Sequence, residues 1–246
     1  MTKMLIVFFS LVFMMIWLLI YKKSYDSPRK RKKITLWIGS HFRGDAKRIY
    51  YFAVLILYLG LPMLFGWLLL RIANVPYAEI FTVNEALQIS PVYLSIMSFI
   101  GGVTLSILST NIMLTIAPKM DIPSNINKVA WIESTLEFPK QIAWMFPFSS
   151  ACIEELFFRG ACFFAFTGVG INPYIAMLIV TIMFIFNQVY LVDNKVQAIV
   201  IGVGSMFLSI LGCFVAGLTG TVIPSMIAHA IYAVFFIKSN DSFDAV

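Results

Sequence analysis

The sequence predicts an all-α membrane protein: a polytopic helical bundle with seven or eight transmembrane segments and a cytoplasm-facing intramembrane cavity. The prediction rests on the composition, on the recurrence of long apolar runs, and on the placement of most charges between those runs. Of the 246 residues, 60% are hydrophobic and 12% are charged, and the mean hydropathy is +0.89. Soluble domains average about 45–50% apolar and about 25% charged residues. This composition excludes a soluble enzyme and a disordered chain.

Seven apolar segments approach the length of about 20 residues that a membrane-spanning helix needs. In chain order they are Met4–Tyr21, Tyr50–Leu70, Pro91–Pro118, Gln141–Val169, Ile171–Val192, Lys195–Gly217 and Val222–Ile237. The first lacks a small-residue cleavage site and is followed at once by Lys22 and Lys23, so we interpret it as a retained anchor. We expect Pro147 to divide the fourth, since proline lacks a backbone donor. Ser149 and Ser150 would then cap a helix that begins after it, which gives eight segments.

The basic residues predict the orientation of the chain. Ten lysines and arginines lie between Lys22 and Arg48, against Asp26 and Asp45. A basic run beside a membrane span is typical of the cytoplasmic side, where it meets anionic lipids, and we prefer this interpretation to nucleic-acid binding. Alternation of the spans then places the N-terminus outside and the C-terminus in the cytoplasm. We predict a multi-pass protein of a prokaryotic plasma membrane.

The chain reads as a single domain over residues 1–246, without internal repeats. Residues 1–118 supply the N-terminal helices. Residues 119–148 mix charges with Trp131 and Trp144, which is typical of a segment that lies in the headgroup plane on the cytoplasmic side. Residues 149–238 hold the remaining spans and the ionisable residues that carry the functional hypothesis.

Four ionisable residues fall inside predicted spans: Glu154, Glu155, Arg159 and His229. Each costs at least about 2.5–3.5 kcal/mol to insert, so each is a candidate for function. Glu155 and Arg159 are spaced for a helical ion pair, whereas Glu154 projects about 100° away and is free to act as a base toward water. Two structural alternatives stay open. The Glu–Arg pair can join helices, and a membrane histidine can be an interhelical hydrogen-bond donor.

These residues carry a resemblance to a known family. The segment Glu154-Glu155-Leu-Phe-Phe-Arg159-Gly160 resembles the EExxxR motif of the CPBP family, the CAAX protease and bacteriocin-processing intramembrane peptidases, also called the Abi family. The stretch from Gly217 through Pro224 to His229 is similar to the family's closing segment. The resemblance covers about residues 142–236. It implies that Glu154 is the base for the attacking water, that Glu155 and Arg159 support it, and that His229 is the oxyanion donor.

Two positions depart from the family pattern. The FxxxH motif falls on Phe184 to Gln188, so glutamine replaces the expected histidine, and in the HxxxN motif Ala233 replaces asparagine. Glutamine can hold a water but cannot relay a proton. Losing an oxyanion donor can cost about 10²–10³ in rate, and Asn187 is a candidate substitute. A zinc at Glu154, Glu155 and His229 stays open, although a catalytic zinc usually takes about three protein ligands rich in histidine.

We therefore predict an intramembrane endopeptidase of the CAAX-protease type, a hydrolase whose glutamate-activated water attacks a membrane-associated or lipidated peptide or protein. The departures at Gln188 and Ala233 favour an alternative: a catalytically weakened relative acting as a membrane scaffold, regulator or bacteriocin-immunity factor. A transporter is a third possibility, since polar residues at mid-membrane suit one. The chain lacks the repeated halves that many transporters show.

Overall fold

The computed structural model describes residues 2–25, 28–83, 90–116, 129 and 143–241, and in these ranges the chain is helical without strands. The α-helices are α1 (Thr2–Tyr25), α2 (Pro28–His41), α3 (Ala46–Ile72), α4 (Pro91–Ile116), α8 (Met145–Glu155), α9 (Phe164–Gly168), α10 (Pro173–Val189), α11 (Lys195–Thr219) and α12 (Ile223–Asp241). A 3₁₀ turn, η1 (Glu79–Phe81), follows α3, and a π-helix, η2 (Leu156–Phe163), joins α8 to α9. The all-α prediction is confirmed for these residues.

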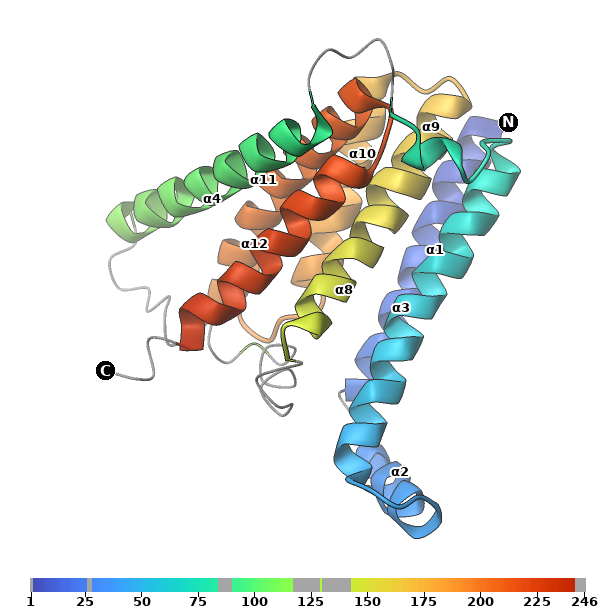
Figure 1. Ribbon diagram of the computed structural model, residues 1–246, viewed down its shortest axis with the longest axis vertical. Coiled ribbons are helices and arrows are strands. Elements are labelled where there is room, and N and C mark those ends of the chain that lie inside the picture. Colours follow the sequence, from blue (N-terminus) through green and yellow to red (C-terminus); the bar gives the residue numbers. More distant parts are fainter. Residues whose placement is uncertain (1, 26–27, 84–89, 117–128, 130–142, 242–246) are drawn as a thin grey trace.

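The helices α1 and α3 form a long antiparallel pair beside the rest of the bundle (Figure 1). At one end of this pair the basic run, expected as a loop, contains the helix α2. Ile38 of α2 packs against the tyrosines at the start of α3, Tyr50 and Tyr51. The helix α3 begins at Asp45, whose carboxylate accepts hydrogen bonds from the backbone amides of Lys47 and Arg48. The basic run is therefore a helix held against α3.

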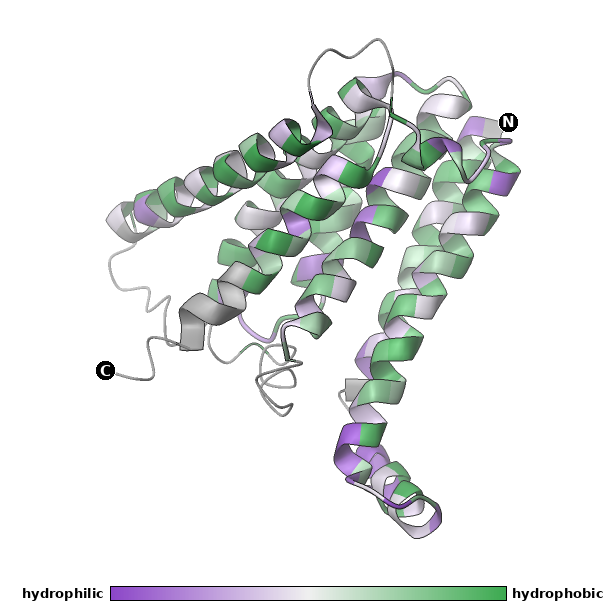
Figure 2. Cartoon of the chain, in the orientation of Figure 1, coloured by the Kyte–Doolittle hydropathy of each residue, from purple (hydrophilic) through white to green (hydrophobic). Residues whose placement is uncertain are grey.

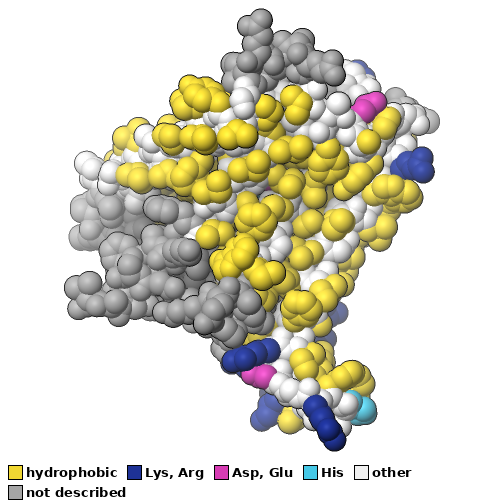
Figure 3. Space-filling view, viewed as in Figure 1, with side chains coloured by type: hydrophobic (Ala, Val, Ile, Leu, Met, Phe, Trp, Pro, Cys, Tyr) yellow, Lys and Arg dark blue, Asp and Glu magenta, His cyan; other side chains and the backbone are white. Residues whose placement is uncertain are grey.

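An apolar surface separates two charged ends of the molecule. Hydrophobic side chains cover the middle of the molecule in Figures 2 and 3, while lysine, arginine and acidic side chains gather near α2 at one end and near η1 at the other. Within the described ranges, four helices are long and apolar enough to cross a membrane, namely α1, α3, α4 and α11, and α10 and α12 are shorter apolar helices. The chain is therefore a multi-pass membrane protein, and the count of seven or eight spans stays a prediction.

The helix that carries the glutamate pair differs from the prediction. Pro147 does not divide it, because Pro147 lies in the first turn of α8, where no intrahelical donor is required. The Ser149 hydroxyl donates to the Met145 carbonyl instead of capping backbone amides. The irregularity lies further along, where α8 passes into η2 directly after Glu155. Single π-turns of this kind occur frequently at functional sites.

Small residues let the N-terminal pair approach the glutamate helix closely. A Cβ placed on Gly66 of α3 would lie 3.1 Å from the Cβ of Ala161 in η2. Beside this contact the buried aromatic rings of Trp17, Phe157 and Phe158 form a core between α1, α3 and η2. The interfacial segment predicted at 119–148 lies outside the described residues except for Val129 and 143–148.

Candidate active site

The two adjacent glutamates of α8 face different neighbours. The carboxylate of Glu154 accepts a hydrogen bond on Oε1 from the Tyr58 hydroxyl, at 2.5 Å, and on Oε2 from the Gln188 amide, at 2.8 Å. The donors come from α3 and α10, so three helices meet at this carboxylate. Both donors are neutral groups, which leaves the negative charge of Glu154 without a directly bonded cation.

Glu155, in contrast, lies inside a charged cluster. Its Oε1 lies 3.0 Å from Nη1 of Arg159 and 2.9 Å from Nδ1 of His229, and both Glu155 and Arg159 are at most 1% exposed. The predicted i, i+4 pairing of Glu155 with Arg159 is thus present. Removing one member of a buried pair typically destabilises a protein by about 3–5 kcal/mol, because the other charge stays buried without compensation. Glu155 therefore serves to neutralise Arg159 and to orient His229.

The guanidinium of Arg159 is enclosed by α8, α10 and α11. It lies over the ring of Phe184, with its Cζ 4.2 Å from the ring centroid. Gly212 of α11 faces it from the other side, since a Cβ on Gly212 would lie 2.9 Å from Nε of Arg159. The aromatic face and the missing side chain provide the room in which a buried cation can pair with Glu155.

A cavity of about 530 Å³ opens beside Glu154. Helices α1, α3, α4, α8, α10, α11 and α12 contribute to its wall, and most of the lining side chains are apolar. The predicted site residues in this wall are Glu154, Phe184, Gln188, His229 and Ala233. Glu155 and Arg159 do not line the cavity. The structure thus separates a carboxylate that can meet a bound molecule from an ion pair that lies behind it.

His229 connects the ion pair to the cavity. Its Nδ1 faces Glu155, and its ring packs edge-on against Phe184 with centroids 5.8 Å apart. A carboxylate at Nδ1 fixes the proton on that nitrogen, so Nε2 is the nitrogen left for the cavity. Nε2 accepts a proton when the ring is neutral and donates a hydrogen bond when the ring is charged.

The two departures from the family pattern both lie in the cavity wall. Gln188 replaces a histidine but still contacts Glu154, whereas Ala233 adds a methyl group without a donor. Asn187, the candidate substitute donor, is fully buried and is not among the cavity-lining residues. Its side-chain amide lies near the Tyr58 hydroxyl without making a hydrogen bond of standard geometry among the described residues. Asn187 therefore does not replace the missing asparagine.

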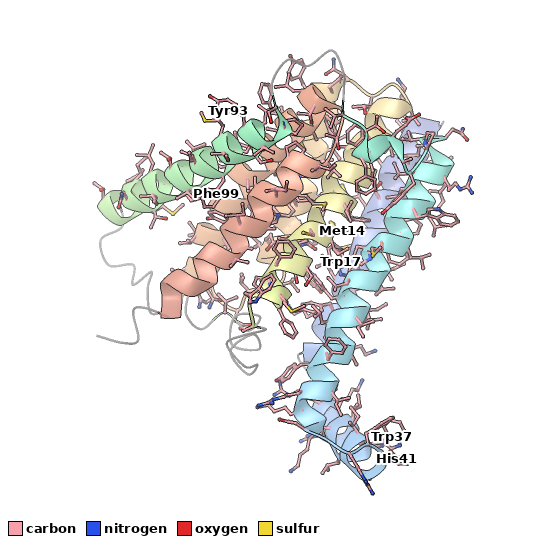
Figure 4. The ribbon with its side chains drawn as sticks, viewed as in Figure 1. Met14, Trp17, Trp37, His41, Tyr93 and Phe99 are labelled. Carbon is pink, nitrogen blue, oxygen red and sulfur yellow. The ribbon has the colours of Figure 1, made fainter. Side chains whose placement is uncertain are left out.

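Tyr58, which donates the shorter of the two hydrogen bonds to Glu154, was not predicted from the sequence. Tyr58 is 96 positions away in the chain, and no local spacing connects the two. Trp17 of α1 and Tyr21 pack against its ring, with centroids 4.9 Å and 4.5 Å away. Figure 4 shows Trp17 on the side of α1 that faces the bundle, whereas Trp37 and His41 lie remote from the site at the tip of α2. Tyr58 is one of three tyrosines in the apolar run Tyr50–Leu70, and nothing in the local sequence distinguishes it from the other two.

The donor set does not match a metal centre. Among the described residues, no group of three or more His, Cys, Asp or Glu side chains is arranged to hold a metal ion. Oε1 of Glu155 already faces both Arg159 and His229, and Glu154 meets Tyr58 and Gln188. The described side chains therefore do not provide the donor set that a zinc at Glu154, Glu155 and His229 would need.

A comparison with protein families supports the sequence resemblance. Residues 139–235 match the family model described as Type II CAAX prenyl endopeptidase Rce1-like. The searches of curated proteins and of solved structures gave no match. The matched segment includes both glutamates, Arg159, Gln188 and His229, and it excludes Tyr58. Residues 139–235 of this membrane protein are therefore similar to the Rce1-like type II CAAX prenyl endopeptidases, a family of membrane proteases.

Proposed function

We propose that this chain is an intramembrane endopeptidase that hydrolyses a peptide bond in a membrane-associated or lipidated peptide. The observation that carries the proposal is the position of Glu154. Its carboxylate lies in the wall of a largely apolar cavity of about 530 Å³, inside a bundle whose outer surface is apolar. An acid inside a membrane bundle is costly to bury, which makes Glu154 a candidate for a functional role. The family of residues 139–235 supports the same chemistry.

The proposed reaction uses Glu154 as general base and then as general acid. Its carboxylate removes a proton from water while the water oxygen bonds to the carbonyl carbon of the scissile peptide. The carbonyl electron pair moves to oxygen and forms a tetrahedral oxyanion. The carbon–nitrogen bond then breaks as the leaving amine takes the proton from Glu154. The products are a carboxylic acid and an amine, and the glutamate returns to its starting state.

His229 is the proposed donor to the oxyanion. Because Glu155 occupies Nδ1, a charged His229 ring presents Nε2–H to the cavity. The negative charge of Glu155 stabilises that charged ring, and Arg159 holds Glu155 in place at 3.0 Å. Ala233 contributes nothing to the oxyanion, so we expect slow turnover.

The apolar wall of the cavity fits a substrate that carries a lipid or an apolar peptide segment. Leu55, Val103, Ile107 and Leu208 line it, and they belong to α3, α4 and α11. Ser106, Thr110 and Asn111 of α4 add a polar strip in the same wall. Apolar side chains suit the lipid and hydroxyl or amide groups suit a peptide backbone. We propose that both parts of a lipidated peptide enter this space.

The α2 end is the proposed cytoplasmic end, and α2 is the proposed contact with anionic lipids. Arg29 to Lys33 form a basic turn of α2, and Leu36 and Trp37 next to it are 66% and 56% exposed. Cations beside exposed apolar groups favour a negatively charged headgroup layer. The test is thiol labelling in intact cells of Ser40→Cys and Glu79→Cys, each in a background lacking the native cysteines. Labelling of Ser40→Cys by an impermeant reagent would refute the orientation.

The test of the function is cleavage of an internally quenched peptide ending in a farnesylated CAAX sequence. The protein is purified in detergent as wild type, Glu154→Gln and Glu79→Gln. Glu79 is exposed in η1 and serves as the matched control for loss of an acid. We expect cleavage by wild type and Glu79→Gln and its loss in Glu154→Gln, with unchanged thermal unfolding in all three. Equal activity of Glu154→Gln and wild type would refute the peptidase and favour the scaffold alternative.

A further inference from the structure

A residue outside the family segment makes the shortest contact with Glu154. Tyr58 belongs to α3, is 5% exposed, and donates its hydroxyl to Oε1 of Glu154 at 2.5 Å. Gln188 donates to the other oxygen, Oε2, at 2.8 Å. The family model begins only at residue 139, so nothing in it assigns Tyr58.

We propose that Tyr58 is a positioning residue that holds the Glu154 carboxylate in its reactive orientation, so that α3 is part of the active site. The proposal rests on the peptidase function proposed above. The N-terminal helix α3 would then contribute a residue to the active site that the family segment 139–235 does not contain.

The chemistry of the two donors supports this role. A carboxylate oxygen can accept two hydrogen bonds, so each oxygen of Glu154 keeps capacity for a water in the cavity. Tyr58 of α3 and Gln188 of α10 donate to different oxygens of the carboxylate. With both oxygens held, the carboxylate cannot rotate about its terminal torsion, which is otherwise soft. Gln188, at the position of the family's histidine, bonds to Oε2. The Tyr58 phenol, which is a stronger hydrogen-bond donor than an alcohol, fixes the other oxygen, Oε1.

The packing around Tyr58 keeps its hydroxyl at this place. Trp17 and Tyr21 of α1 lie against its ring, at 4.9 Å and 4.5 Å. Two turns further along α3, Gly66 brings the backbone against Ala161 of η2. These contacts anchor α3 to the helix that carries Glu154. The position of the hydroxyl is therefore set on two sides, by α1 and by η2.

The experiment compares Tyr58→Phe with Tyr50→Phe on the farnesylated peptide. Tyr50 is a buried tyrosine of the same helix that does not line the cavity, which makes it the matched control for loss of a buried hydroxyl. Because a hydrogen bond to a charged group is lost, we expect kcat of Tyr58→Phe to fall about tenfold to hundredfold, with KM and thermal unfolding unchanged. In a Glu154→Gln background, Tyr58→Phe should have no further effect. A wild-type kcat for Tyr58→Phe would overturn the proposal.

A second measurement does not depend on turnover. The infrared difference between wild type and Glu154→Gln isolates the carboxylate band of Glu154, and the same difference in the Tyr58→Phe background should show that band shifted. An unshifted band would overturn the proposal even if activity fell.

The peptidase function and the role of Tyr58 are refuted by different results. Full activity of Glu154→Gln removes the peptidase function, whereas its inactivity together with full activity of Tyr58→Phe removes only the role of Tyr58.

Discussion

The imidazole of His229 is paired with Glu155 and not with Glu154: its Nδ1 lies 2.9 Å from Oε1 of the second glutamate. The two residues are 74 positions apart and come from α12 and α8. The two neighbouring glutamates therefore have different contacts and different proposed roles. Glu155 contacts both the histidine and Arg159, whereas Glu154 lies in the cavity wall and is bonded only to the neutral donors Tyr58 and Gln188.

This division predicts that loss of His229 affects catalysis more than binding. In His229→Ala the oxyanion loses its donor, and we expect kcat to fall by about 10²–10³ with little change in KM. His41→Gln is the control, because the other histidine of the chain is exposed at the tip of α2 and stacks on Trp37 (Figure 4). Initial rates over a range of peptide concentrations separate kcat from KM. A reduction in kcat below threefold would contradict the assigned role.

The buried pair predicts an asymmetric effect on stability. Arg159→Leu leaves the Glu155 carboxylate buried without its cation, and we expect the free energy of unfolding to fall by about 3–5 kcal/mol. Replacing both residues, in Arg159→Leu with Glu155→Leu, removes the uncompensated charge and should recover part of that loss. Denaturant unfolding in detergent gives both values. If the double variant is less stable than Arg159→Leu, the pair is not the source of the effect.

The close approach of Gly212 to Arg159 predicts that a larger side chain at position 212 destabilises the protein. A Cβ at this position would lie 2.9 Å from Nε of Arg159, and the enclosed guanidinium has little room to move. We expect Gly212→Ala to destabilise the protein by about 1–3 kcal/mol through overpacking. Gly60 of α3 is the matched control, since a Cβ there meets nothing within 4 Å. Thermal unfolding of the two variants should differ, and an equal change in both would show that only backbone freedom matters.

The sequence supported the prediction of the helical class and of the charged residues of the site, because both rest on local patterns. Apolar runs identify helices, and Glu155 with Arg159 is a neighbouring pair on one helix. The family resemblance placed His229 in the same site as the glutamates, but it did not predict the contact of His229 with Glu155. Pro147 misled the prediction of the helix boundary, because a proline breaks a helix only beyond its first turn.

The missed features depend on tertiary contacts between distant segments. Tyr58 reaches Glu154 because Gly66 lets α3 pack closely against η2. No residue pattern within α3 predicts this contact. The exclusion of Asn187 from the cavity depends likewise on how α10 is turned against its neighbours. The π-helix after Glu155 is a third example, since its residues Leu156 to Phe163 have the composition of any apolar helix.

Ala233 offers a prediction of gained activity. It lies four residues after His229 on the same face of α12, and both line the cavity. In Ala233→Asn the side-chain amide adds a donor beside Nε2 of His229, and we expect kcat to rise at least about tenfold, since one oxyanion donor is worth about 10²–10³ in a formed site. Ala233→Leu has the same number and branching of side-chain heavy atoms as asparagine but no donor, so it separates hydrogen bonding from filling of the cavity. The rates of both variants are measured on the farnesylated peptide. A rise shared by asparagine and leucine, or a rise in neither, would show that the oxyanion forms elsewhere in the cavity.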